Sequence, residues 1–175
     1  MNINKFLVKA KEADIDVSEN KITKTTSSSI SIFRGEIDSN EFSSTSSLTA
    51  RGIYKGKLGA VSSENLNDSS IDSLIKDIKT NATLIEKEEE PIIYRGSKDY
   101  KKKNTFNKQL SELTTSSVLP LLYEIERKTK EKDSRVSDVQ VSFQIQEEEF
   151  VFANSYGLNL KTHSNYFVLV GEVYM

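Results

Sequence analysis

Extended segments in this 175-residue chain are gathered into two groups instead of alternating with helices. The first group runs from Ile15 to Ser63 and is rich in Ser, Thr, Ile and Val. In the second group, from Val139 to Val173, apolar and polar residues alternate as far as Ile145, which is the period of a half-buried strand. Clustered strands favour an α+β fold. We therefore predict two small units, each an antiparallel sheet packed with helices.

Short glycine-containing segments are predicted to be the turns between these strands. Arg34-Gly35-Glu36 follows one alternating run, and Lys55-Gly56 separates two extended runs by only two residues. A two-residue loop with glycine is typical of a tight hairpin. In the second group, Phe150–Asn154 is followed by a turn at 154–157, and the strands at 158–162 and 166–173 continue an antiparallel meander.

Three segments have the periodicity of helices that bury one face. Residues 3–13 form a short stripe, with Asn2 as a candidate N-cap. Ser69 and Asp72 have the spacing of a capping box before the second helix. A third helix is predicted within 106–132, with its regular part beginning near Pro120, because proline has no N–H to donate. The second helix has the clearest apolar stripe: Ile71, Leu74, Ile75, Ile78, Ala82 and Ile85.

A charged segment separates the two groups of strands. Glu86–Pro91 is acidic and Lys98–Lys103 is mainly basic. We therefore expect an N-terminal α+β unit over 1–85, a charged linker over 86–105, and a second unit of helix and β meander over 106–175. We also expect the second unit to be truncated, because the sequence ends within an apolar, strand-like run.

The lysines of the charged segment could instead mark a nucleic-acid patch. The chain, however, has 24 Lys and Arg against 26 Asp and Glu, a net charge of −2. No aromatic stacking platform accompanies the lysines. The composition therefore favours a solvated linker and no direct contact with nucleic acid.

The residue types exclude most catalytic sites. The chain has no cysteine and one histidine, so sulfur-ligated metals and multi-histidine zinc sites are excluded. His163 has no evident carboxylate partner, and the Ser and Thr runs have no base to activate a hydroxyl. Glu147-Glu148-Glu149 is interpreted as a solvated turn and not as a cation site. We assign no catalytic residue, no metal ligand and no cofactor to this chain, and its substrate-binding residues remain unknown.

Neither a signal peptide nor a transmembrane helix is predicted. Lysines interrupt the apolar residues at the N-terminus, and no run of about 18 apolar residues occurs. We therefore expect a soluble, cytoplasmic protein with no membrane contact, and the absence of cysteine permits secretion as well.

Three segments together resemble one known family. Ser29–Asp38 is similar to its early strand–turn–strand, Ala50–Ser62 to the hairpin before its first long helix, and Ala153–Gly157 to a turn of its second region. The family is that of the TldD/PmbA metallopeptidases (peptidase U62), whose members are also proposed modulators of DNA gyrase. The chain resembles the N-terminal region and is closer to PmbA (TldE) than to TldD. The matching positions are interpreted as architectural: Arg51, Gly52, Gly59, Asn154, Ser155 and Gly157.

The resemblance implies a longer cytoplasmic protein that cleaves unfolded or leader-bearing peptides. TldD-type members have a His-Glu-x-x-x-His zinc motif downstream of this region and act as a heterodimer with a PmbA-type partner that lacks it. In this chain Ser164-Asn165 follows His163, so no metal ligand can be transferred. Zinc is implied only for the TldD-type subunit, and the expected partners are a TldD- or PmbA-type subunit, in a homo- or heterodimer, and a peptide.

Two hypotheses of function follow. In the first, the chain is the scaffold and substrate-channel part of such a peptidase and is inactive alone. In the second, it is a freestanding β-rich module that binds a peptide or protein without catalysis. The Ser- and Thr-rich strands and the lack of catalytic groups are compatible with both hypotheses.

Overall fold

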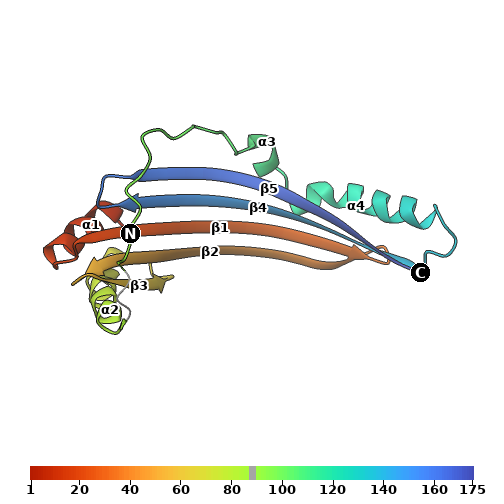
Figure 1. Cartoon of the computed structure of the whole chain (residues 1–175). Helices are drawn as coiled ribbons and strands as arrows, with labels where there is room; N and C mark the ends of the chain where they lie inside the picture. The colour runs from red at the N-terminus through yellow and green to blue at the C-terminus, as the bar shows by residue number, and fades with distance from the viewer. Residues whose placement is uncertain (87–89) are drawn as a thin grey trace. The chain divides into compact units, whose positions relative to one another are not determined.

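The α+β fold is confirmed by the computed structural model, which describes residues 1–86 and 90–175. The elements are α1 (Ile3–Glu12), β1 (Val17–Phe33), β2 (Glu36–Tyr54), β3 (Lys57–Ser63), a 3₁₀ turn (Asp68–Ser70), α2 (Ile71–Thr83), α3 (Lys108–Ser111), α4 (Thr115–Lys130), β4 (Asp138–Asn154) and β5 (Asn159–Tyr174) (Figure 1). The strands form a five-stranded sheet in the order β3-β2-β1-β4-β5. The edges of the sheet are therefore β3 and β5.

Four of the strands are much longer than the sequence predicted. β1, β2, β4 and β5 have 17, 19, 17 and 16 residues, whereas strands usually have about 5–6. The prediction of a turn at Glu147–Glu149 is wrong, because these residues lie within β4. β4 contains no glycine or proline that would interrupt it, and its carboxylates are only partly buried or exposed.

The described residues form two compact units that are interleaved in the sequence. Unit 1 contains residues 1–24, 45–103 and 149–162, and unit 2 contains residues 25–44, 104–148 and 163–175. These units do not follow the expected boundaries of 1–85, 86–105 and 106–175. The reason is the length of β1, β2, β4 and β5, since each of them contributes one end to unit 1 and the other end to unit 2.

In unit 1, the apolar stripe predicted for the second helix is buried. Five of its six residues lie in the core, and Ile85, just beyond α2, is 41% exposed. The capping box expected at Ser69 and Asp72 is wrong: Ser70 is the N-cap, and its hydroxyl donates to the Asn67 carbonyl at 2.7 Å. The remaining core residues of this cluster come from α1, from the connection between α1 and β1, and from the strands: Phe6, Ala10, Ile15, Ile22, Leu48 and Ala50.

In unit 2, α4 packs its apolar face against strand residues. Val118 and Leu122 of α4 share one core cluster with Ile30, Ile32, Val139, Val141 and Phe143. The helix predicted within 106–132 is divided into α3 and α4, and α4 begins before Pro120 instead of near it. Thr114 caps α4 in a capping box with Ser117. Pro120 is the sixth residue of α4 and has no N–H to donate to the Ser116 carbonyl, so one backbone hydrogen bond of the helix is lost there.

Both predicted hairpin turns are confirmed. Arg34 and Gly35 have φ of 54° and 76°, and Lys55 and Gly56 have φ of 51° and 74°. Two successive positive φ angles are typical of a type I′ turn, which matches the twist of paired strands. The second turn sets the antiparallel register of β2 and β3, in which Tyr54 pairs with Lys57 and Gly52 pairs with Gly59.

Gly59 allows the backbone of α2 to approach β3 closely. A Cβ atom at this position would lie 1.9 Å from the Ile78 carbonyl oxygen. Because the obstacle is helix backbone and not a flexible side chain, it cannot be relieved by a change of rotamer.

We predict that Gly59→Ala destabilises unit 1 by about 3 kcal/mol, the upper part of the range for overpacking. Thermal or urea unfolding measures the effect. Gly171→Ala is the matched control, since a Cβ there has nothing within 4 Å. Equal stability of the two variants would contradict the close approach of α2.

Candidate functional site

The described residues do not form a metal centre. Within 1–86 and 90–175, no group of three or more His, Cys, Asp or Glu side chains could hold a metal ion. In the same residues, no helix is long and apolar enough to cross a membrane. Candidate functional side chains lie in the motif segments, at the single histidine, on the charged segment, along the β5 edge of the sheet and in a cavity of unit 1.

Two motif residues on β2 lie on opposite faces of the strand. A Cβ on Gly52 would meet the side chains of Ile15 and Ile78, so this glycine makes room for the helical layer. Arg51 points to the other face, where its Nε donates to Glu19 Oε1 at 2.5 Å. Glu19 is 4% exposed. A guanidinium beside a buried carboxylate offsets part of the cost of removing that charge from water.

The other motif residues shape the turn between β4 and β5. The buried Asn154 side chain accepts from the backbone N–H groups of Tyr156 and Leu158, at 3.0 and 3.1 Å. Ser155 exchanges two hydrogen bonds with the backbone of Ser18, one through its N–H and one through its hydroxyl oxygen. Gly157 has a φ of 90°, a conformation that glycine adopts without strain.

The segment expected to be a solvated linker is partly packed against unit 1. Ile93 is 4% exposed, and the Tyr94 carbonyl accepts from Asn154 Nδ2 at 2.6 Å. The Tyr94 hydroxyl bonds to Ser97 and then, more weakly, to Tyr100, and these bonds hold the pKa of Tyr94 below its usual value. Residues 87–89 of the predicted linker lie outside the described residues.

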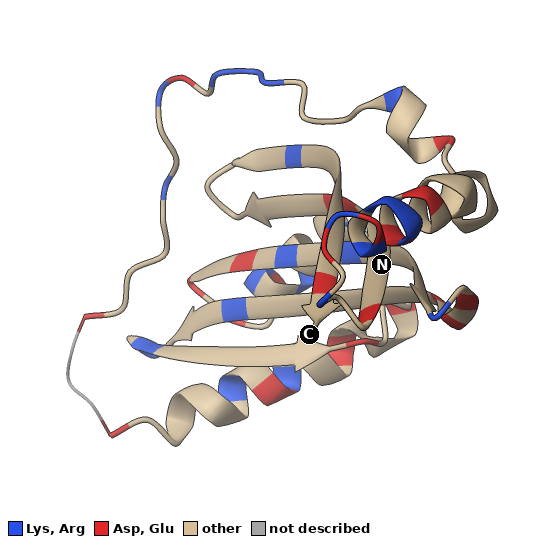
Figure 2. Cartoon of the chain, turned by 90° about the vertical axis from the view of Figure 1, so that its right-hand side faces the viewer, with Lys and Arg blue, Asp and Glu red and all other residues tan. Residues whose placement is uncertain are grey.

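The basic end of the same segment, residues 98–103, has no regular secondary structure. The last residue of the segment, Thr105, forms an isolated bridge. Figure 2 shows a blue stretch on the coil that leads to α3, and Lys98, Lys101, Lys102 and Lys103 are all exposed. Their arrangement on an irregular segment agrees with the interpretation as solvated charges.

His163 has a carboxylate partner that sequence reasoning missed. Its Nε2 lies 2.8 Å from Glu147 Oε1 on β4, the strand next to β5. Its ring also stacks on Phe106, with 4.0 Å between the ring centroids. Thr105 pairs with Ser164 in an isolated bridge, so this cluster fastens the chain before α3 to β5. The Thr105 hydroxyl adds a further bond, since it donates to the His163 carbonyl at 3.1 Å.

β5 is an edge strand with exposed apolar side chains. Those with 41–56% of their surface exposed include Tyr166, Phe167, Val168, Leu169, Val170 and Val173. Natural edge strands usually carry charges or prolines that prevent pairing with another strand. The described part of β5 after His163 contains only one charged residue, Glu172.

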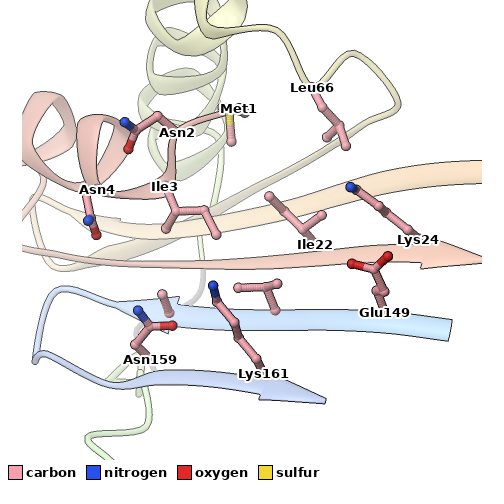
Figure 3. Close-up of a pocket in the computed structure, with 12 residues that line it drawn as sticks. Met1, Asn2, Ile3, Asn4, Ile22, Lys24, Leu66, Glu149, Asn159 and Lys161 are labelled. Carbon is pink, nitrogen blue, oxygen red and sulfur yellow. The ribbon is translucent and has the colours of Figure 1, made fainter. Parts of the chain in front are cut away.

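A cavity of about 340 Å³ lies on the helical side of unit 1 (Figure 3). Its apolar floor is formed by Ile22 of β1 and by Val151 and Ala153 of β4. Three charged side chains from β1, β4 and β5 also line it: Lys24, Glu149 and Lys161. The first residues of α1 and Leu66 complete the wall.

The wall formed by α1 is held in place by Asp68. Asp68 Oδ1 accepts from the Asn2 backbone N–H at 2.7 Å, and Oδ2 pairs with Lys5 at 3.3 Å. The bond from Asn2 and, to a smaller extent, the contact with Lys5 hold the pKa of Asp68 below its usual value. This contribution to stability is present above the usual pKa of aspartate and is lost as the pH falls through the lowered value.

The sequence of residues 6–82 matches the family described as PmbA/TldA metallopeptidase domain 1. Residues 6–82 are a domain 1 of the PmbA/TldD family. The resemblance read from the motifs is thereby confirmed. No curated protein matches the chain by sequence.

Crystal structures of three proteins share the fold of this PmbA/TldD-type chain. One is a proposed modulator of a DNA gyrase from Thermotoga maritima, with a TM-score of 0.82 and 15% identity over 95% of this chain and 37% of that one. Another is a proposed modulator of DNA gyrase from Bacteroides thetaiotaomicron, with a TM-score of 0.86 and 16% identity over 97% of this chain and 39% of that one. The third is TldE from Thermococcus kodakarensis, with a TM-score of 0.81 and 18% identity over 98% of this chain and 38% of that one.

This PmbA/TldD-type chain spans less than two fifths of the length of each of these proteins. Their likeness therefore concerns the fold. The preference for PmbA over TldD, the architectural role of the motif residues and the cytoplasmic location stay predictions.

The hydrogen bonds of Asn154 generate a test. We predict that Asn154→Ala destabilises the protein by about 2–3 kcal/mol, because it removes three hydrogen bonds to partly buried backbone groups. It should also expose residues 91–97 to hydrogen exchange. Asn154→Asp keeps the acceptor oxygen for the β4–β5 turn and loses the donor to the Tyr94 carbonyl. It should therefore raise hydrogen exchange at residues 91–97 and leave exchange in the turn at 154–158 unchanged. Unchanged exchange at 91–97 in both variants would contradict this role.

Proposed function

We propose that this chain is the scaffold and substrate-channel region of a PmbA/TldD-type zinc metallopeptidase. The observation that carries the proposal is the domain 1 match over 6–82, together with a fold shared over 95–98% of the chain with larger proteins of related description. Proteolysis, a peptide substrate and a TldD- or PmbA-type partner subunit are parts of this proposal.

The edge of β5 beyond Asn165, past the bridge to Thr105, supports a role in holding extended peptides. A peptide that adds as a strand bonds through its backbone, so many sequences are accepted, while side chains contact the neighbouring surface. The exposed apolar residues of β5 offer such a surface. The exposed, Ser- and Thr-rich part of β2 offers fewer apolar contacts.

Hydrolysis would be carried out by zinc in the His-Glu-x-x-x-His motif of a TldD-type subunit. Two imidazoles from adjacent helical turns can bind one zinc ion, and the glutamate can activate its water. In this division of labour, the present chain binds and orients the peptide backbone. The competing hypothesis of a freestanding binding module shares the binding step and lacks the catalytic partner.

We predict that the purified chain binds no stoichiometric zinc and cleaves no unfolded peptide. Addition of a TldD-type subunit from the same genome should give zinc-dependent cleavage that exceeds that of the added subunit alone. Metal analysis and a fluorogenic casein assay measure the two effects. One tightly bound zinc per chain, or turnover without the second subunit, would refute the proposal. Peptide binding without any gain in cleavage would favour the freestanding module.

A further inference from the structure

The cavity shown in Figure 3 combines an apolar floor with cations above it. Ile22 is buried on β1 and Ala153 is buried on β4, and Val151 is half-buried beside them. Lys24 and Lys161 are exposed and rise from the sheet on the side where α1 begins. A ligand in this cavity would therefore place an apolar group on the sheet and an anionic group near the lysines.

Among residues 1–86 and 90–175, neither lysine has a carboxylate within ion-pair distance. The ion pairs formed by the described residues involve neither Lys24 nor Lys161. The cavity is also lined by Ile3 and Asn4, the first two residues of the ten-residue helix α1. Their N–H groups are among those without an intrahelical acceptor, while the Asp68 carboxylate, which accepts from the Asn2 N–H, offsets part of the positive charge of this helix N-terminus. The two lysines and these N–H groups favour an anion.

The remaining polar side chains favour a ligand that also has amide groups. Glu149 can accept a hydrogen bond from an N–H group, and it would weaken the binding of a ligand that carries only negative charge. Asn4 and Asn159 can both donate and accept. A volume of about 340 Å³ lies at the lower end of the range for ligand cavities, which suits one or two amino-acid residues.

We propose that this cavity binds the C-terminal residue of a peptide, with the carboxylate near Lys24 and Lys161 and an apolar side chain on Ile22, Val151 and Ala153. The proposal rests on the proposed function only in the choice of a peptide over another carboxylic acid. It adds a chain-end preference to a scaffold that would otherwise recognise only extended backbone.

The test is equilibrium binding to the purified chain, without zinc or a second subunit. The probe is a fluorescein-labelled tetrapeptide, Gly-Ser-Gly-Leu, with a free carboxylate, compared with the same peptide as its C-terminal amide. We expect the amide to bind about tenfold more weakly, since a hydrogen bond to a charged group contributes more than one to a neutral group. Equal affinity of the acid and the amide would overturn the proposal, as would no binding of the acid. Unlabelled octanoate should compete poorly, and competition as strong as that of the unlabelled peptide acid would overturn the assignment to a peptide.

Charge-removing variants locate the site. Lys161→Gln and Lys24→Gln should each weaken binding of the acid about tenfold and leave that of the amide unchanged. Lys102→Gln removes the same charge from the exposed coil and should change neither affinity. An equal effect of all three variants would show a general charge effect and refute the site. Because binding needs no catalysis, loss of the proposed peptidase function would leave these results unaffected.

Discussion

The structure depends on the continuity of four long strands. Each of them supplies one end to each compact unit, so the hydrogen bonds of one sheet serve two separate hydrophobic clusters. Uninterrupted strands of this length require residues that tolerate partial exposure on both faces, and the many Ser, Thr and Glu residues in them meet that requirement. Without these strands, the helices of either unit would have no apolar surface to cover.

Polar side chains also hold segments of unit 1 in place. Asn154 binds its own turn and the carbonyl of Tyr94, while Asp68 binds the first turn of α1. Each such side chain satisfies backbone groups that have no partner in a helix or strand. The hydrogen bonds of Asn154 and Ser155 agree with the predicted architectural role of the motif residues in the β4–β5 turn.

Two surfaces of the described residues offer features that a ligand could use. The cavity of unit 1 has an apolar floor beneath Lys24 and Lys161, and the β5 edge has exposed apolar side chains. The one histidine is engaged with Glu147 and Phe106. A region that holds a peptide while another subunit supplies zinc is consistent with these features.

The sequence by itself determined the α+β class, the buried stripe of α2, the turns at 34–35 and 55–56, and the family. These features depend on residues close together in the chain, where helical period and turn chemistry are recognisable. Strand lengths were missed because short polar interruptions resemble turns until a neighbouring strand pairs with them. The contact of His163 with Glu147, the burial of Ile93, and the meeting of Lys24, Glu149 and Lys161 around one cavity were decided only by the tertiary structure. Strand pairing and packing bring together residues far apart in the sequence, and no local pattern specifies them.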